Sequence, residues 1–175
     1  FSKVKESKWL HSLIVLPMVI PEVITGLSLL LFFLLLRFPL GFGTMVLAHA
    51  SFSASFVFFI VLEQVKKLDA HLSEAALDLG AKPSQVFWQV TLPNIFPGVM
   101  SGFLLAFTIS FDDFLISFFT GGAGVTTLPL KIYSMVRVGI TPELNALSLI
   151  MISMSTALIL LLLAKSKRTP WKYES

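Results

Sequence analysis

Three carboxylates lie in stretches that are otherwise apolar. Glu22 directly follows Pro21 midway through one long apolar run, and Asp112 and Asp113 come late in another. A carboxylate deep in hydrocarbon costs on the order of 2.5 to 3.5 kcal/mol, so it is expected to face water or a cation. Acidic side chains at these places therefore favour a pathway for a positively charged solute.

The two aspartates lie near one end of their apolar run. A helix that starts at Pro93 carries both residues about 28 Å along its axis, close to the outer end of the hydrocarbon core. Thr108 and Ser101 extend a thin polar stripe from Asp112, whereas Asp113 points about 100° away. We expect Asp112 to contribute more to a cation pathway than Asp113. The alternative is that both carboxylates simply lie in the outer headgroup region.

Glu22 is preceded by two helix-disrupting residues. Pro17 and Pro21 remove backbone donors and predict a kinked or broken helix around Glu22. Discontinuous helices with a polar group at mid-depth commonly line transport sites. Glu22 could also pair with His49 of the next apolar run as a buried structural contact, and the two interpretations are compatible.

The composition is that of a membrane protein. Hydrophobic residues make up 55% of the chain and charged residues 13%, with a mean hydropathy of +0.87, whereas soluble domains carry roughly a quarter charged residues. The net charge of +3 does not indicate a nucleic-acid partner, because the basic residues form no basic face. The sequence has no cysteine for thiolate metal sites, and His11, His49 and His71 lack the spacing of metal ligands.

Four stretches are long and apolar enough to cross a hydrocarbon core of about 30 Å, which takes roughly 20 helical residues. They run over residues 10–36, 44–65, 92–119 and 144–164. Helices are expected, because backbone groups in lipid must be hydrogen-bonded within the segment and no strand-like alternation recurs. The predicted fold class is an all-α membrane protein with four transmembrane helices in one domain. Because residue 1 is Phe, the chain is expected to begin inside a longer protein.

The basic residues predict the orientation of these helices. If the N-terminus is cytoplasmic, ten of the 13 Lys and Arg residues fall in cytoplasmic segments, as the positive-inside rule requires. The ten are Lys3, Lys5, Lys8, Lys66, Lys67, Lys82, Lys165, Lys167, Arg168 and Lys172. Both ends of the chain and the loop of residues 66–91 are therefore expected on the cytoplasmic side.

The 66–91 loop has the pattern of a small helical hairpin. Asp69 can cap a first short helix, Gly80 can end it in a left-handed conformation, and Pro83 can start a second. Apolar residues recur at helical spacing in the first helix: Leu68, Leu72, Ala75, Ala76 and Leu79. The small Ala side chains leave a shallow surface that another protein can approach closely. Alternatively, the hairpin merely lies on the lipid surface.

A spaced motif runs through this loop into the following span. It consists of Glu74, Ala75, Ala76, Gly80, Val90, Leu92 and Pro93. The motif resembles the EAA motif of bacterial ABC importer permeases, with Val90 in place of the usual Ile. The resemblance implies that the loop is a coupling helix, which docks in a cleft of a separate cytoplasmic ATP-binding subunit. ATP would then be handled by that partner, with no cofactor in this chain.

A second stretch, Ser110 to Ile150, is similar to the same region of PotC-type permease subunits of spermidine/putrescine importers. The similarity runs over nearly the whole chain. It implies a six-helix fold, of which the first two spans lie outside this chain, in the bacterial inner membrane. It also implies a polyamine substrate, a second permease subunit and an extracytoplasmic substrate-binding protein as partners.

Three other segments have simpler interpretations. Residues 121–124 lack the Lys-Ser/Thr that completes a phosphate loop and are expected to form a turn. Residues 128–138 are expected to form an external amphipathic helix, which either touches a binding protein or is an ordinary surface helix. Ser51, Ser53 and Ser55 are expected to pack helices together through small side chains.

A second function class would use the same carboxylates. A proton-coupled secondary carrier or an intramembrane enzyme could employ Glu22, Asp112 and Asp113. A carrier works without a partner ATPase, which leaves the 66–91 loop unexplained. An intramembrane hydrolase needs a nucleophile and a base in one constellation, which two adjacent aspartates do not provide. The pattern therefore favours a permease subunit over an enzyme.

Overall fold

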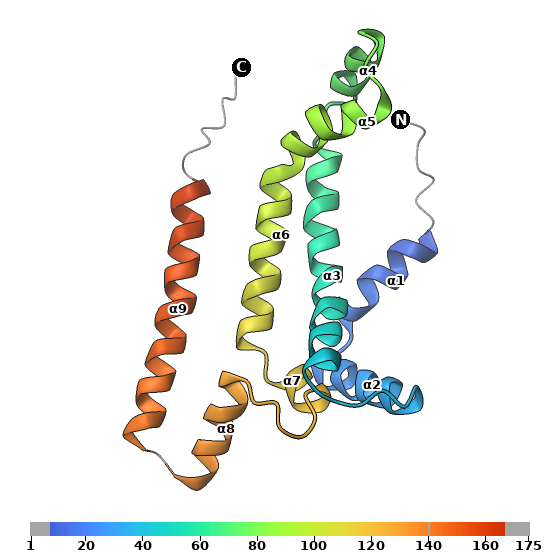
Figure 1. Ribbon diagram of the computed structural model, residues 1–175. Helices are drawn as coiled ribbons and strands as arrows, with labels where there is room; N and C mark the ends of the chain where they lie inside the picture. Colours follow the sequence, from blue (N-terminus) through green and yellow to red (C-terminus); the bar gives the residue numbers. More distant parts are fainter. Residues whose placement is uncertain (1–7, 140, 167–175) are drawn as a thin grey trace. The chain divides into compact units, whose positions relative to one another are not determined.

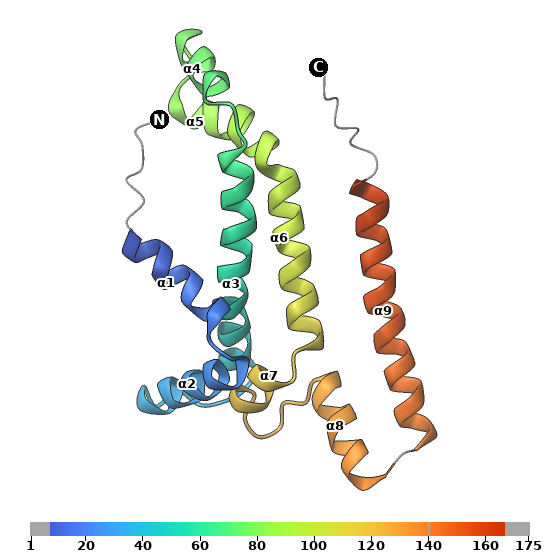
Figure 2. The ribbon, with the colours of Figure 1, turned by 180° about the vertical axis from the view of Figure 1, so that it is seen from behind.

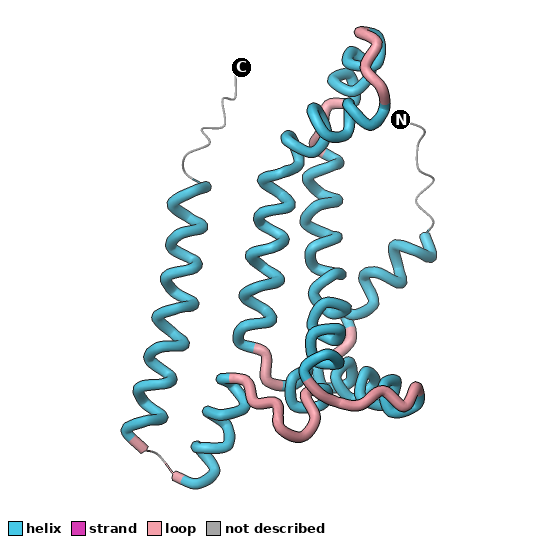
Figure 3. The backbone as a smooth tube through the Cα atoms, in the orientation of Figure 1, coloured by secondary structure: helices cyan, strands magenta, loops and turns pink. Residues whose placement is uncertain are grey.

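The computed structural model describes residues 8–139 and 141–166 of the 175-residue chain, and every regular element in these ranges is helical (Figure 3). The chain divides after Val125 into two compact units, which we describe separately. The first unit holds α1 (Lys8–Val19), α2 (Glu22–Leu35), α3 (Phe42–Lys66), α4 (Ala70–Asp78), α5 (Pro83–Val86), the π-helical segment η1 (Phe87–Thr91), α6 (Leu92–Asp112) and α7 (Leu115–Thr120) (Figure 1). The second unit holds α8 (Leu128–Val138) and α9 (Pro142–Ser166).

Three helices among the described residues are long and apolar enough to cross a membrane. They cover Phe42–Lys66, Pro83–Asp112 and Pro142–Leu160. The second of these joins α5, η1 and α6 without interruption. The all-α membrane fold predicted from the sequence is confirmed, and the spans expected at 44–65 and 144–164 each correspond to one long helix.

The structure corrects the span expected at 10–36, which is two helices. α1 has 12 residues and α2 has 14, which corresponds to about 18 and 21 Å, so neither alone crosses about 30 Å of hydrocarbon. The break at Pro21 was predicted, and its cause is local: a proline disfavours helical backbone at the preceding residue, Ile20, and lacks a donor itself. Pro17 stays inside α1. Figures 1 and 2 show the chain turning between the two helices.

The structure also corrects the span expected at 92–119. Its helix begins earlier, at Pro83, and ends at Asp112. Asp113 then takes an extended conformation (φ −64°, ψ 129°), and the separate helix α7 follows from Leu115 (Figure 3). The apolar composition continues across this break, so hydropathy alone did not reveal it.

Pro93 lies inside the long helix because the turn before it is wider than an α-helical turn. A proline removes one helix donor, and its ring clashes with the carbonyl four residues earlier, which here belongs to Gln89. In η1 the hydrogen bond from Leu92 N–H reaches Phe87 O, five residues back. Such a π-helical turn admits the proline without ending the helix.

Small residues allow α3 and α6 to pack side by side (Figures 1 and 2). A Cβ atom added at Gly98 would lie 2.7 Å from Gln64 Cβ, and one added at Gly102 would lie 3.0 Å from Val57 Cγ1. Glycines at these two positions therefore set the distance between the helices, as small residues commonly do between membrane helices. Ser53 and Ser55 are buried on α3 as predicted, whereas Ser51 is exposed.

The buried core of the first unit lies where α2, α3 and α7 meet. Its members are Phe33, Ala48, Phe52 and Ile116. Large apolar side chains elsewhere on the long helices are exposed, as expected for surfaces that face lipid. The core thus fixes the two short helices, α2 and α7, against α3.

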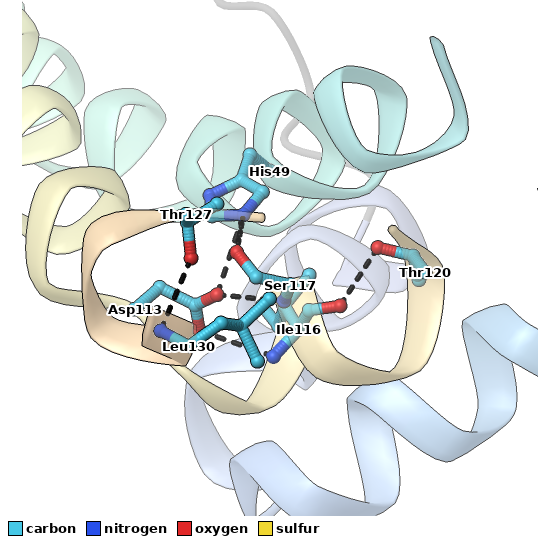
Figure 4. A network of polar contacts seen from close by, with 7 residues as sticks. All are labelled: His49, Asp113, Ile116, Ser117, Thr120, Thr127 and Leu130. Carbon is cyan, nitrogen blue, oxygen red and sulfur yellow. Dashed lines mark hydrogen bonds and ion pairs between the residues drawn. The ribbon is translucent and has the colours of Figure 1, made fainter. Parts of the chain in front are cut away.

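The predicted turn and amphipathic helix are both present. Gly122 and Gly124 have φ angles of +65° and +91°, which only glycine adopts readily. In the second unit, α8 spans the expected residues 128–138, and Thr127 Oγ1 accepts a hydrogen bond from Leu130 N at 3.5 Å at its start (Figure 4).

Candidate functional site

The carboxylate of Asp113 lies at the break between α6 and α7 (Figure 4). Asp113 Oδ1 accepts a hydrogen bond from Ile116 N at 3.1 Å, and Oδ2 accepts one from Ser117 N at 2.8 Å. The first N–H groups of a helix have no partner within the helix. Asp113 supplies acceptors for these groups, so its side chain serves as a cap for α7.

His49 of α3 reaches the same carboxylate (Figure 4). Its Nε2 atom lies 3.3 Å from Asp113 Oδ2 and 3.0 Å from Ser117 Oγ. A carboxylate only accepts hydrogen bonds, so Nε2 carries the hydrogen in this contact. A second bond ties the other end of α7 to α3, because Thr44 Oγ1 donates to Thr120 O at 2.8 Å.

Glu22 completes this group of polar side chains from α2. It stands in the first turn of α2 and is partly exposed. Its carboxyl lies close enough to that of Asp113 for the two side chains to interact. We refer to Glu22, His49, Asp113 and Ser117 as the acidic cluster.

The acidic cluster brings together two of the three predicted carboxylates, Glu22 and Asp113, and leaves Asp112 outside it. Asp113 is buried, with a side chain only 1% exposed, whereas Asp112 is exposed beside the cluster. The sequence prediction gave Asp112 the larger part because it assumed one continuous helix. The helix ends between Asp112 and Asp113. The angle between successive residues of a helix therefore no longer describes how their two side chains point relative to each other.

Two members of the cluster have roles that the sequence prediction did not assign. His49 was considered only as a partner for Glu22, and it contacts Asp113 and Ser117 instead. Ser117 was not considered at all. Ser117 follows Asp113 by four residues, a spacing that brings two side chains together only on a helix. The sequence therefore indicated a contact between them only weakly.

The hairpin expected in the 66–91 loop is confirmed as α4 and α5. Asp69 Oδ1 accepts a hydrogen bond from His71 N at 2.9 Å and caps α4. The chain leaves α4 through Gly80, whose φ angle is +86°. Pro83 begins α5, as its preference for the first helical position predicts.

The motif residues lie at both ends of this hairpin. Glu74 and Ala75 are exposed on α4 and Ala76 is half-buried, and Glu74 Oε2 lies 3.5 Å from His71 Nδ1. At the other end, Leu92 and Pro93 join η1 to α6.

The hairpin exposes several large apolar side chains. Leu72 is 46% exposed, Leu77 41% and Leu79 88%, while Ser73 and Val86 are buried inside the hairpin. Leu72 and Leu79 belong to the apolar set predicted from helical spacing. These side chains are available for contact with another protein or with the membrane.

The described ranges contain no group of three or more His, Asp or Glu side chains arranged to hold a metal ion. The acidic cluster offers two carboxyl groups, an imidazole and a hydroxyl. Such groups bind cations through charge and hydrogen bonds.

Comparison with known proteins identifies relatives over most of the chain. Residues 2–165 match the family described as "Binding-protein-dependent transport system inner membrane component". The putrescine transport system permease protein PotI of Escherichia coli K12 is 44% identical over 154 residues, which cover 85% of this chain and 55% of the relative. The spermidine/putrescine transport system permease protein PotC of Haemophilus influenzae is 41% identical over 144 residues, covering 82% and 56%.

The PotC protein of Escherichia coli K12 is 40% identical over 143 residues, which cover 82% of this chain and 54% of the relative. The chain thus spans about half the length of the curated relatives it matches. The family match and these identities extend over both described units. The chain belongs to the family of inner-membrane components of binding-protein-dependent transport systems.

Proposed function

We propose that this chain is part of the membrane permease subunit of an ATP-driven importer for polyamines such as spermidine and putrescine. The named relatives belong to putrescine and spermidine/putrescine transport systems, which supports this substrate class. The subunit forms part of the translocation pathway, and a separate ATPase subunit hydrolyses ATP. No cofactor is needed in this chain.

The observation that carries the substrate class is the charge of the acidic cluster. Two carboxyls, Glu22 and Asp113, meet one imidazole, and no ion pair between either carboxyl and a Lys or Arg occurs in the described part of the chain. Polyamines are polycations whose ammonium groups need compensation in a low-dielectric pathway. Asp112 adds an exposed carboxylate beside the cluster. An anion pathway would present Arg, Lys or helix N-termini instead.

The α4–α5 hairpin is the proposed docking site for the ATPase subunit. Its EAA-like motif, the exposed apolar side chains of α4 and its position between the two long helices α3 and α6 support this role. Docking places the hairpin in the cytoplasm of a bacterial cell, with both ends of the chain on the same side. A second permease subunit and an extracytoplasmic substrate-binding protein complete the transporter.

Uptake of labelled putrescine and spermidine tests this proposal. The transporter containing this chain is reconstituted in vesicles with its partner subunits, the binding protein and ATP. We expect ATP-dependent uptake, which Glu74→Lys abolishes together with co-purification of the ATPase, because the charge reversal disrupts docking.

The matched control is Lys82→Glu, a charge reversal of an exposed residue outside the motif in the same hairpin. Uptake that persists without ATP and the ATPase subunit would favour a proton-coupled carrier and overturn the proposal.

A further inference from the structure

The carboxylate of Asp113 has little capacity left for a ligand. Its Oδ1 atom accepts from Ile116 N, and its Oδ2 atom accepts from Ser117 N and lies 3.3 Å from His49 Nε2. The side chain is 1% exposed. A solute could reach Asp113 directly only if the packing around α7 opened.

The same contacts bind α7 to α3. His49 stands on α3, and Ser117, whose hydroxyl lies 3.0 Å from His49 Nε2, stands on α7. We call His49, Asp113 and Ser117 the α3–α7 latch (Figure 4). α7 has only six residues, too few to hold its position without such tertiary contacts.

Glu22 differs from Asp113 in both surroundings and contacts. It is partly exposed, its helix begins without a side-chain cap, and its carboxyl lies against that of Asp113. Two neighbouring carboxyls disfavour each other's charged form, and a cation beside the more exposed one, Glu22, relieves that repulsion. An ammonium group carries three donors and a positive charge, so it fits this place chemically.

We propose that the two carboxyls have different tasks: Glu22 contacts an ammonium group of the polyamine, while Asp113, held by His49, is a positioning residue that keeps α7 in place. This inference rests on the proposed function. It means that Glu22 determines how tightly the solute binds, whereas the α3–α7 latch determines how fast the solute passes.

Uptake kinetics separate these two tasks. In the reconstituted transporter, we expect Glu22→Gln to raise the KM for putrescine and spermidine about tenfold, the loss typical of a charged hydrogen-bond partner, with the maximal rate little changed. We expect His49→Leu to lower the maximal rate with KM nearly unchanged. His49→Gln keeps a side-chain N–H donor and is expected to restore most of the rate.

Two further variants sharpen the comparison. Asp113→Asn is expected to behave like His49→Leu, because it replaces an acceptor with an amide donor beside Ser117 N. Glu63→Gln is the matched control for Glu22→Gln, since Glu63 is paired with Lys66 near the other end of α3. Co-purification of the complete transporter shows that each variant assembles.

The outcomes distinguish the inference from the function on which it rests. An Asp113→Asn transporter whose KM rises as much as that of Glu22→Gln, at an unchanged maximal rate, would show that Asp113 touches the solute and overturn the inference alone. The same holds if His49→Gln assembles but is as slow as His49→Leu. A parental transporter that takes up no polyamine would overturn the proposed function, and this inference with it.

Discussion

At the residue scale, two neighbouring aspartates have opposite surroundings. Asp112 is exposed at the end of α6, while Asp113 is buried and supplies acceptors for two backbone N–H groups of α7. A buried N–H group that loses its partner costs more free energy than an exposed carboxylate contributes. The two positions should therefore differ sharply in their effect on stability.

We predict that Asp113→Ala destabilises the protein, because Ile116 N and Ser117 N lose their acceptor at about 1–3 kcal/mol for each buried group. Asp112→Ala is the matched control and is expected to leave stability nearly unchanged. Thermal unfolding in detergent, followed by intrinsic tryptophan fluorescence, measures the difference. Equal unfolding temperatures for the two variants would contradict the capping role of Asp113.

At the element scale, the short helices α2 and α7 depend on each other. Neither is long enough to cross the membrane, and the two pack together closely at Gly26. A Cβ atom at Gly26 would lie 2.8 Å from Phe119 Cδ2 and 3.4 Å from Leu115 O. Gly26 thus lets α2 and α7 lie closer together than any other residue at this position would allow.

We predict that Gly26→Ala destabilises the protein by about 1–3 kcal/mol, the usual cost of overpacking a close contact. Gly43→Ala provides the control, since a Cβ atom there meets nothing within 4 Å. The added methyl group at Gly43 favours helix and is expected to leave stability unchanged or raised by up to about 1 kcal/mol. The unfolding temperatures of the two variants test this difference.

The α4–α5 hairpin is the second element whose shape requires a particular residue at one position. Gly80 has a φ angle of +86° with nothing within 4 Å of an added Cβ atom, so a substitution there strains the backbone without a clash. β-Branched residues are especially unfavourable in this conformation. A change at Gly80 should therefore act on the shape of the hairpin and not on the packing of the long helices.

We predict that Gly80→Val abolishes uptake and co-purification of the ATPase subunit, while the unfolding temperature of the membrane helices stays close to that of the parent. Ser84→Val introduces the same side chain at an exposed position of α5 and should retain both activities. Normal uptake by Gly80→Val would remove the basis for a docking role of the hairpin.

At the scale of the whole molecule, the first unit places two functional features far apart. The loop that carries the α4–α5 hairpin follows α3 at Lys66, and His49 lies 17 residues earlier on the same helix, which corresponds to about 26 Å along its axis. α6 returns from the hairpin to Asp112, next to the acidic cluster. The two long helices therefore connect the proposed ATPase site with the proposed solute site.

We predict that these two features lie on opposite sides of the membrane. The chain has no cysteine, so single cysteines report position without interference. Ser84→Cys is expected to react with a membrane-impermeant reagent only from the cytoplasmic side, and Ala123→Cys only from outside. Ala123 suits this test better than Gly122, where a Cβ atom would lie 2.6 Å from Leu40 O. The reverse labelling pattern would overturn the orientation.

The sequence by itself determined the features that depend on local chemistry. Prolines and glycines restrict the backbone wherever they stand, so the break at Pro21, the end of α4 at Gly80 and the start of α5 at Pro83 were predictable. Apolar runs likewise predicted the long helices at 44–65 and 144–164, but not where the helix expected at 92–119 begins and ends. Asp69, Gly80 and Pro83 indicated the hairpin, and the resemblance of its motif to the EAA motif implied the proposed partner.

Only the tertiary structure decided which carboxylate is buried and what surrounds it. The contact between His49 and Ser117 joins residues 68 positions apart, and that between Thr44 and Thr120 joins residues 76 positions apart. No periodic pattern in the sequence indicates that these residues lie in contact. α6 ends at Asp112 because the Asp113 side chain caps a new helix, and that helix is stable only through its packing against α2 and α3. Long-range packing, not local propensity, therefore decides the arrangement of the acidic cluster.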